Sequence, residues 1–107
     1  MPSGKKVRRY PRVFLPKGTM VAWEHSGRRY VSSISVLALG GLFILTPEPP
    51  AAGDAIKLIF DVPSGDVRAR AVVRDSQPGK GMGIEFTAME PAAQERLQKL
   101  MNILTRV

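Results

Sequence analysis

The chain has 107 residues, which is the size of one domain built around a single hydrophobic core. It contains no cysteine and one histidine, so the composition excludes disulfides, thiolate metal sites and cysteine nucleophiles, and most histidine-based metal or acid–base sites. With 44% hydrophobic residues the chain is expected to fold, and its formal net charge of +7 predicts an anionic partner. That partner could be a nucleic acid, a nucleotide or an acidic protein face.

The first distinctive stretch is basic. Residues 5–12 read Lys-Lys-Val-Arg-Arg-Tyr-Pro-Arg, which is five cations in eight residues. Pro11 favours an extended chain before it, so Arg8 and Arg12 could approach one anion from two sides. Their planar guanidinium groups suit phosphate or a purine edge. We expect residues 1–12 to form a flexible basic arm and residues 13–107 to form the folded domain, although a solvated charge run is the simpler interpretation of the arm alone.

Alternating residues predict the first two strands. Residues 19–24 alternate, with Val21 and Trp23 on one face, and end at His25-Ser26-Gly27, which is a hairpin signal. The next strand is expected at about residues 29–37. Trp23 is assigned to the core because a strand of period two needs a large apolar residue there.

A glycine pair interrupts the strong strand pattern of residues 39–45. Gly40 and Gly41 indicate a bulge, a point where another group approaches the backbone closely, or a turn between strands. The proline-rich residues 46–50 that follow are typical of a surface connection.

The second half alternates regularly and then changes period. Strands are expected near residues 56–61, 67–74 and 82–86, with turns at residues 63–66 and 77–81. From Pro91 an apolar stripe at spacings of three and four predicts an amphipathic helix, and Ile103 falls outside that stripe. The fold class is therefore mainly β: a six-stranded antiparallel β-barrel with a C-terminal α-helix packed on it.

Several functions are disfavoured. The longest apolar run, residues 42–45, is far too short to span a membrane, so no membrane insertion and a cytoplasmic protein are expected. Aromatic residues do not recur beside the basic ones as base-stacking platforms would, which makes nucleic acid an unlikely partner. No set of carboxylates, histidines or nucleophiles forms a plausible catalytic group, so neither an enzyme nor a cofactor nor a metal is expected.

Three stretches, residues 8–12, 39–44 and 81–86, together resemble the PilZ family in order and spacing, over most of the chain from Arg8 to Leu104. PilZ domains are bacterial receptors for cyclic diguanylate (c-di-GMP), and their pattern is RxxxR followed by [D/N]xSxxG. Arg8 and Arg12 match the first motif. The resemblance implies that they grip the ligand's phosphates and guanine edges, with Arg9 as an auxiliary, on a PilZ-like barrel of the split-barrel type.

The second motif departs from the pattern. Aligned on the glycine pair, Val36 takes the place of Asp or Asn, Ala38 takes the place of Ser, and Gly41 is the final glycine beside Gly40. Guanine donors that would meet a carboxylate would face methyl groups instead, and each buried unpaired donor costs about 1–3 kcal/mol.

Three hypotheses follow. The first is a stand-alone PilZ-domain protein that binds c-di-GMP, through Arg8, Arg9, Arg12, Gly40 and Gly41, and relays the signal to a protein partner. The second is a degenerate PilZ adaptor that acts by protein–protein interaction without nucleotide. The third is a basic barrel that binds nucleic acid non-specifically, which would show a steep salt dependence.

Overall fold

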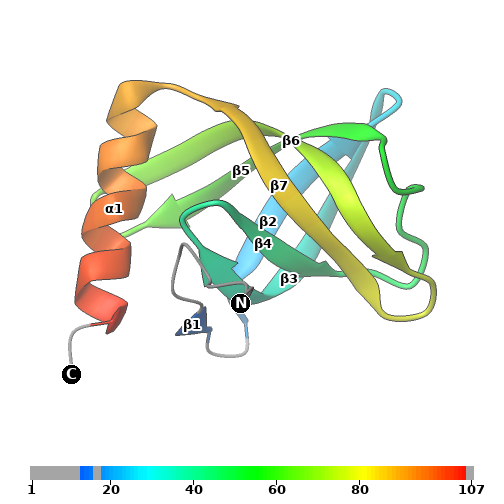
Figure 1. Ribbon diagram of the computed structural model, residues 1–107, viewed down its shortest axis with the longest axis horizontal. Coiled ribbons are helices and arrows are strands. Elements are labelled where there is room, and N and C mark those ends of the chain that lie inside the picture. Colours follow the sequence, from blue (N-terminus) through cyan, green and yellow to red (C-terminus); the bar gives the residue numbers. More distant parts are fainter. Residues whose placement is uncertain (1–12, 16–17, 106–107) are drawn as a thin grey trace, which may run out of the picture.

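The computed structural model describes residues 13–15 and 18–105, which form seven strands and one helix (Figure 1). The elements in chain order are β1 (Val13–Phe14), β2 (Met20–His25), β3 (Arg28–Ala38), β4 (Gly41–Leu45), β5 (Ala55–Val62), β6 (Gly65–Gln77), β7 (Gly81–Met89) and α1 (Pro91–Thr105).

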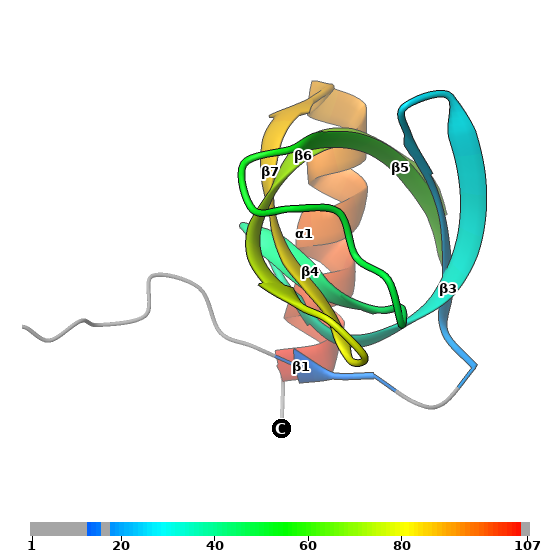
Figure 2. The same cartoon turned by 90° about the vertical axis from the view of Figure 1, so that its right-hand side faces the viewer.

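The strands form one closed antiparallel barrel. Their order is β1-β3-β2-β5-β6-β7-β4, and β4 also pairs with β3, which closes a six-stranded ring (Figure 2). The additional strand, β1, pairs with β3 outside that ring. The predicted six-stranded antiparallel barrel is confirmed, and the short β1 adds to it a strand that alternation in the sequence did not reveal.

The β2–β3 hairpin follows from its turn residues. Ser26 and Gly27 have φ angles of 51° and 80°, so both central residues of the two-residue loop are left-handed, as a type I′ turn requires. His25 at the end of β2 is further held by a hydrogen bond of 3.0 Å between its Nε2 and the Oδ2 of Asp54. The predicted hairpin at residues 25–27 is confirmed.

The barrel interior is filled by every second residue of each strand. Val21, Val67, Val73 and Met82 are fully buried there. Trp23 is 3% exposed and donates its indole N–H to the Oγ of Ser32 at 3.0 Å, so the large ring is buried without an unpaired donor. The assignment of Trp23 to the core is confirmed.

β6 continues beyond its predicted end at residue 74, as far as Gln77, and its pairing with β7 shifts register twice, at residues 70/71 and 73/75. The polar residues 75–77 carry no hydrophobic alternation, so only their pairing with β7 identifies them as strand.

Helix α1 lies across one open end of the barrel (Figures 1 and 2). Ala93, Leu97 and Met101 are buried against the strands, as the stripe predicted, whereas Ile103 is 59% exposed. The guanidinium of Arg96 also donates from Nη1 to the backbone carbonyl of Asp66 at 3.0 Å. Apolar burial and this one polar contact together attach the helix to β6.

No helix among the described residues is long and apolar enough to cross a membrane. Within the same residues, no group of three or more His, Asp or Glu side chains could hold a metal ion.

Candidate functional site

The candidate site is built where β1 meets β3. The described chain begins at Val13, directly after Arg12, and Val13 pairs with Leu37 while Phe14 pairs with Val36. The N–H of Leu15 donates to the carbonyl oxygen of Ser35 at 2.9 Å and continues this pairing. Strand β1 therefore holds the residue that follows RxxxR against the middle of the degenerate second motif.

The three predicted arginines, Arg8, Arg9 and Arg12, lie outside the described residues, as does the whole of the expected arm 1–12. Their contacts, and the boundary between arm and barrel, stay predictions.

The side chains of the second motif point away from the core. The pairing of β3 with β4 shifts register between Ile34 and Val36, which leaves Ser35 as the extra residue of a β-bulge. After the bulge Leu37 is 1% exposed in the core, so its neighbours Val36 and Ala38, both half-buried, lie on the outer side. We call this outer side, with Phe14, Val36, Ala38 and Phe43, the β1–β3 face.

The β1–β3 face is apolar across three strands. Phe14 pairs with Val36, and Val36 pairs with Phe43, and paired residues of antiparallel strands project to the same side. Phe14 is 83% exposed, whereas Phe43 is half-buried because its ring lies over β7, 3.8 Å from where a Cβ on Gly83 would be. The described part of this face therefore offers apolar surface in place of the polar groups of the family motif.

The glycine pair ends β3 and starts β4. Gly40 lies in the turn, and its carbonyl oxygen accepts the N–H of Phe86 at 2.9 Å. Gly41 has a structural reason to be glycine, because a Cβ there would overlap the carbonyl oxygen of Ile84 on β7. The sequence left three interpretations of the glycine pair open. The structure shows two of them, a turn and a close approach to the backbone, and the approaching group is β7.

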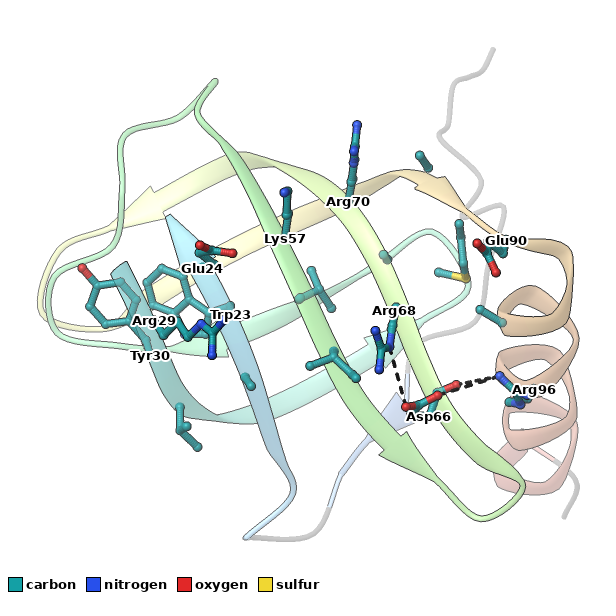
Figure 3. A pocket seen from close by; sticks show the side chains of 18 residues that line it. Trp23, Glu24, Arg29, Tyr30, Lys57, Asp66, Arg68, Arg70, Glu90 and Arg96 are labelled. Carbon is teal, nitrogen blue, oxygen red and sulfur yellow. Dashed lines mark hydrogen bonds and ion pairs between the residues drawn. The ribbon is translucent and has the colours of Figure 1, made fainter. Parts of the chain in front are cut away.

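The opposite wall of the barrel carries a second notable surface. A broad shallow hollow spans the outer sides of β2, β5 and β6, from the β2–β3 hairpin to the start of α1 (Figure 3). At one edge Tyr30 stacks on Trp23, with ring centroids 4.2 Å apart and planes inclined by 19°. The hollow's cationic side chains are those of Arg29, Lys57, Arg68, Arg70 and Arg96.

Two of these cations face each other and form no ion pair, although Glu24 on β2 is the cross-strand partner of Lys57 on its other side. Lys57 and Arg70 are direct cross-strand partners, both are exposed, and neither has an ion pair or hydrogen bond in the described part of the chain. Like charges directly opposite in a sheet are destabilising. The sequence analysis missed this pair, although counting back from a two-residue turn at residues 63–64 would have placed the two residues opposite each other.

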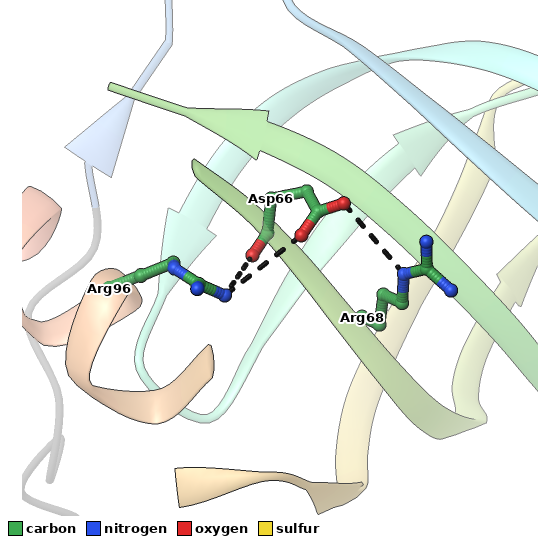
Figure 4. A network of polar contacts seen from close by, with 3 residues as sticks. All are labelled: Asp66, Arg68 and Arg96. Atoms are coloured by element: carbon green, nitrogen blue, oxygen red, sulfur yellow. Dashed lines mark hydrogen bonds and ion pairs between the residues drawn. The ribbon is translucent and has the colours of Figure 1, made fainter. Parts of the chain in front are cut away.

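Arg68 and Arg96 of the hollow do have a carboxylate partner, whereas Arg29 has no ion pair among the described residues. Asp66 lies between Arg68 and Arg96, with its oxygens 3.8 Å from Arg68 Nε and 3.9 Å from Arg96 Nη1 (Figure 4). Arg74 donates from Nε to Glu85 Oε1 at 2.6 Å. Exposed pairs of this kind contribute little to stability, about 0–1 kcal/mol each. Lys57 and Arg70 form no such pair among the described residues.

Fold and site together define a class. A closed six-stranded antiparallel barrel, finished by a C-terminal helix and carrying an accessory strand beside the β3–β4 turn, is the architecture of a small PilZ-like domain. The family model of the PilZ domain matches residues 6–102, so the chain belongs to the PilZ domain family. PilZ proteins are generally receptors or adaptors rather than enzymes.

Solved structures show the same fold at low sequence identity. The PilZ domain of YcgR from Escherichia coli with c-di-GMP has a TM-score of 0.72 at 18% identity, covering 94% of this chain and 93% of that one. The inhibitor of motility MotI/DgrA from Bacillus subtilis has a TM-score of 0.75 at 17% identity, covering 96% and 55%. PlzA from Borreliella burgdorferi in complex with c-di-GMP has a TM-score of 0.72 at 12% identity, covering 90% and 41%. This chain thus spans about half the length of the last two proteins. A comparison with curated proteins found no match.

Proposed function

We propose that this chain is a receptor for c-di-GMP, and that the nucleotide binds on the β1–β3 face with the arginines of residues 8–12 around it. One observation carries the proposal: Val13, the residue after RxxxR, pairs with Leu37, between the motif positions Val36 and Ala38. The residue that follows the arginine stretch therefore lies against the second motif, although the two are distant in the sequence. Consecutive Cα atoms are about 3.8 Å apart, so the arginine stretch starts from that place.

The chemistry of the arm suits this ligand. A cyclic dinucleotide carries two phosphodiester charges and two purines whose edges accept hydrogen bonds, and arginine can pair bidentately with either group. We assign Arg8 and Arg12 to the phosphates and guanine edges and Arg9 to an auxiliary contact. Gly40 and Gly41 belong to the proposed site through the turn beside Ala38.

The affinity for c-di-GMP is expected to be lower than that of a site with the complete family motif. Val36 and Ala38 offer no acceptor to the guanine N1 and N2 donors, and each donor left unpaired on burial costs about 1–3 kcal/mol. That cost corresponds to roughly one to two orders of magnitude in affinity per lost contact.

The test is calorimetric titration of the parent with c-di-GMP, with GTP as the control ligand. We expect the double variant Arg8→Ala/Arg12→Ala to lose binding with a nearly unchanged melting temperature, because both residues precede the core strands. The double variant Lys57→Ala/Arg70→Ala is the matched control, since it removes the same charge from the opposite wall and should bind like the parent. Failure of the parent to bind would refute the receptor function, and parent-like binding by the arginine variant would refute the assigned contacts.

The signal is proposed to pass to a protein partner. The wall of β5 and β6 supports this part of the proposal, because Lys57 and Arg70 face each other unpaired beside the apolar side chains of Ile59 and Val31. Cations over apolar surface suit an acidic protein face better than a regular phosphate backbone. If the parent does not bind c-di-GMP, the same surface would serve the alternative, an adaptor that acts without nucleotide.

The division of the chain is part of the proposal. Residues 1–12 would act as the basic arm that closes on the ligand, and residues 13–107 as the barrel with its helix. Amide hydrogen exchange with and without c-di-GMP tests this division. Added protection of the arm in the bound state is expected, and equal protection in both states would contradict an arm that closes on the ligand.

A further inference from the structure

Phe14 is the most exposed large hydrophobic residue of the described chain, with 83% of its surface accessible. A single exposed hydrophobic residue is ordinary and indicates no function by itself. Phe14 differs from Val31 and Ile103, which are also exposed, because it lies on a paired strand directly beside the proposed ligand site.

The orientation of Phe14 is set by its two neighbours. Val13 and Leu15 are partly buried and pack against the core, and Leu15 also donates its N–H to Ser35 at 2.9 Å. In an extended segment successive side chains point to opposite sides, so anchoring Val13 and Leu15 inward directs Phe14 outward. The ring is thus presented to solvent by a strand that is tied to β3 on both sides of it.

The surroundings of the ring suit a flat aromatic ligand. Phe14 stands beside Val36, in the row that continues to Phe43, and no charged side chain of the described residues shares this row up to Phe43. The row is narrow, since Val36 and Phe43 are already half-buried, which favours one planar ring over an extended protein contact. In the sequence, the basic stretch of residues 5–12 directly precedes β1. An anionic ligand with planar bases would therefore suit both the cations of that stretch and the apolar row.

We propose that Phe14 is a base-stacking residue of the ligand site, with its ring packed against the face of one guanine of c-di-GMP. This inference rests on the receptor function proposed above. It assigns the site a different way of holding the base, because stacking contacts the base face whereas the Asp or Asn and Ser of the family pattern would pair with its edge. Apolar side chains at positions 36 and 38 are compatible with stacking and incompatible with edge pairing.

The experiment compares Phe14→Ala, Phe14→Leu and Phe14→Trp by calorimetry with c-di-GMP. Removing one base–aromatic stack should weaken binding by roughly 5- to 150-fold in Phe14→Ala. Leu should weaken it less than Ala, because it keeps apolar contact without a ring, and Trp should bind as tightly as Phe or more tightly. Val31→Ala is the matched control, since Val31 is 68% exposed on the outside of β3 and away from this row.

A second readout reports stacking directly. In Phe14→Trp the added indole should be quenched by c-di-GMP, whereas the emission of Trp23, which is buried in the parent, should change little. Melting temperatures of all variants show whether each one is folded. If Phe14→Ala is unfolded, Phe14→Leu takes its place in the comparison with the parent.

The outcomes separate the two proposals. If Phe14→Ala binds like the parent while Arg8→Ala/Arg12→Ala does not bind, the stacking role is wrong and the receptor function stands. If the parent does not bind, both are wrong. If Phe14→Ala leaves the nucleotide affinity unchanged but alters the sedimentation coefficient, Phe14 is a protein contact and the stacking role is wrong.

Discussion

Gly41 illustrates how one residue can belong to a ligand motif and still be required by the fold. It closes the β3–β4 turn at the point where the carbonyl of Ile84 on β7 passes directly over it. Any side chain would have to push β7 away, and β7 is also held on its other edge by β6. The glycine of the second motif is therefore needed for barrel closure whether or not a nucleotide binds.

Replacing Gly41 by alanine should destabilise the domain by about 2–3 kcal/mol, the usual cost of overpacking a close contact. For a domain of this size that corresponds to a fall of roughly 10–20 °C in melting temperature. Gly83→Ala is the control, because a Cβ there would meet Asp75 and Phe43 only at ordinary contact distances of 3.6 and 3.8 Å. Thermal melting that gave equal losses for both variants would contradict this account.

The two substituted motif positions make a second prediction at the residue scale. Val36 and Ala38 face outward, so Val36→Asp/Ala38→Ser should keep the fold and place a carboxylate and a hydroxyl on the β1–β3 face. Hydrogen bonds to a charged group contribute about 1.5–3 kcal/mol, so c-di-GMP should bind roughly tenfold to a few hundredfold more tightly.

Cyclic diadenylate provides the control for this double variant. Adenine lacks the N1 and N2 donors that the new carboxylate would accept, so its affinity should not rise with that of c-di-GMP. Calorimetry measures the affinity of the double variant for both dinucleotides, and thermal melting of the same sample shows whether it is folded. Unchanged affinity for c-di-GMP in a folded variant would mean that the ligand lies elsewhere.

At the scale of elements, α1 is stabilised mainly by the residues it buries. Leu97 and Met101 are 1% and 2% exposed against the barrel end, whereas Ile103 on the same helix is largely in solvent. The polar contacts of Arg96 with Asp66 and of Gln94 Nε2 with the carbonyl oxygen of Met89 also join the helix to the strands, but both lie at least partly in solvent. The helix should therefore respond strongly to cavity formation and weakly to surface changes.

Leu97→Ala should cost about 2–5 kcal/mol of unfolding free energy, the range for deleting a buried leucine side chain. Ile103→Ala on the exposed side should change it by no more than about 0.5 kcal/mol. Denaturant unfolding of both variants measures the difference. Similar midpoints for the two would indicate that α1 does not pack on the barrel in solution as described.

At the scale of the whole molecule, the barrel separates two surfaces of different character. The β1–β3 face is apolar in its described part, and the opposite wall of β5 and β6 carries the unpaired cations Lys57 and Arg70. Proteins often retain such unfavourable charge pairs for binding at a cost in stability.

Arg70→Glu should therefore stabilise the protein. It replaces a like-charge cross-strand pair with Lys57 by an opposite-charge pair, each worth about 0.2–1 kcal/mol, and the melting temperature should rise by roughly 2–8 °C. The affinity for c-di-GMP should stay within about threefold of the parent, because distant sites act independently.

Arg74→Glu is the matched control with the same change of charge and the opposite expected sign. Arg74 donates to Glu85 at 2.6 Å, so the substitution sets two carboxylates beside each other and should lower the melting temperature. Differential scanning calorimetry compares the two. A fall in both would show that the unpaired cations are not a cost to the fold.

Much of the fold could be predicted because its signals are local. The hairpin at residues 25–27 depends on a glycine that accepts positive φ, and the helix depends on the spacing of Ala93, Leu97 and Met101. The alternation of β5, β6 and β7 likewise reflects the pleat of each strand by itself. The family resemblance rests on short motifs in order, and the family match over residues 6–102 confirms it. Arg8, Arg9 and Arg12 remain predictions from that resemblance.

Other features required the closed barrel. Pairing of the two-residue β1 with β3, the bulge at Ser35, and the carbonyl of Ile84 over Gly41 all join residues that are distant along the chain, and no local pattern encodes such contacts. Whether Val36 faces core or solvent depended on that bulge, because one extra residue in a strand reverses which side chains point outward. The sequence by itself determined which stretches become strands, turns and helix, since those choices follow from backbone propensity and period. Only the tertiary structure decided that Phe14 stands exposed beside Val36, because that neighbourhood exists only once β1 has paired with a strand more than twenty residues away.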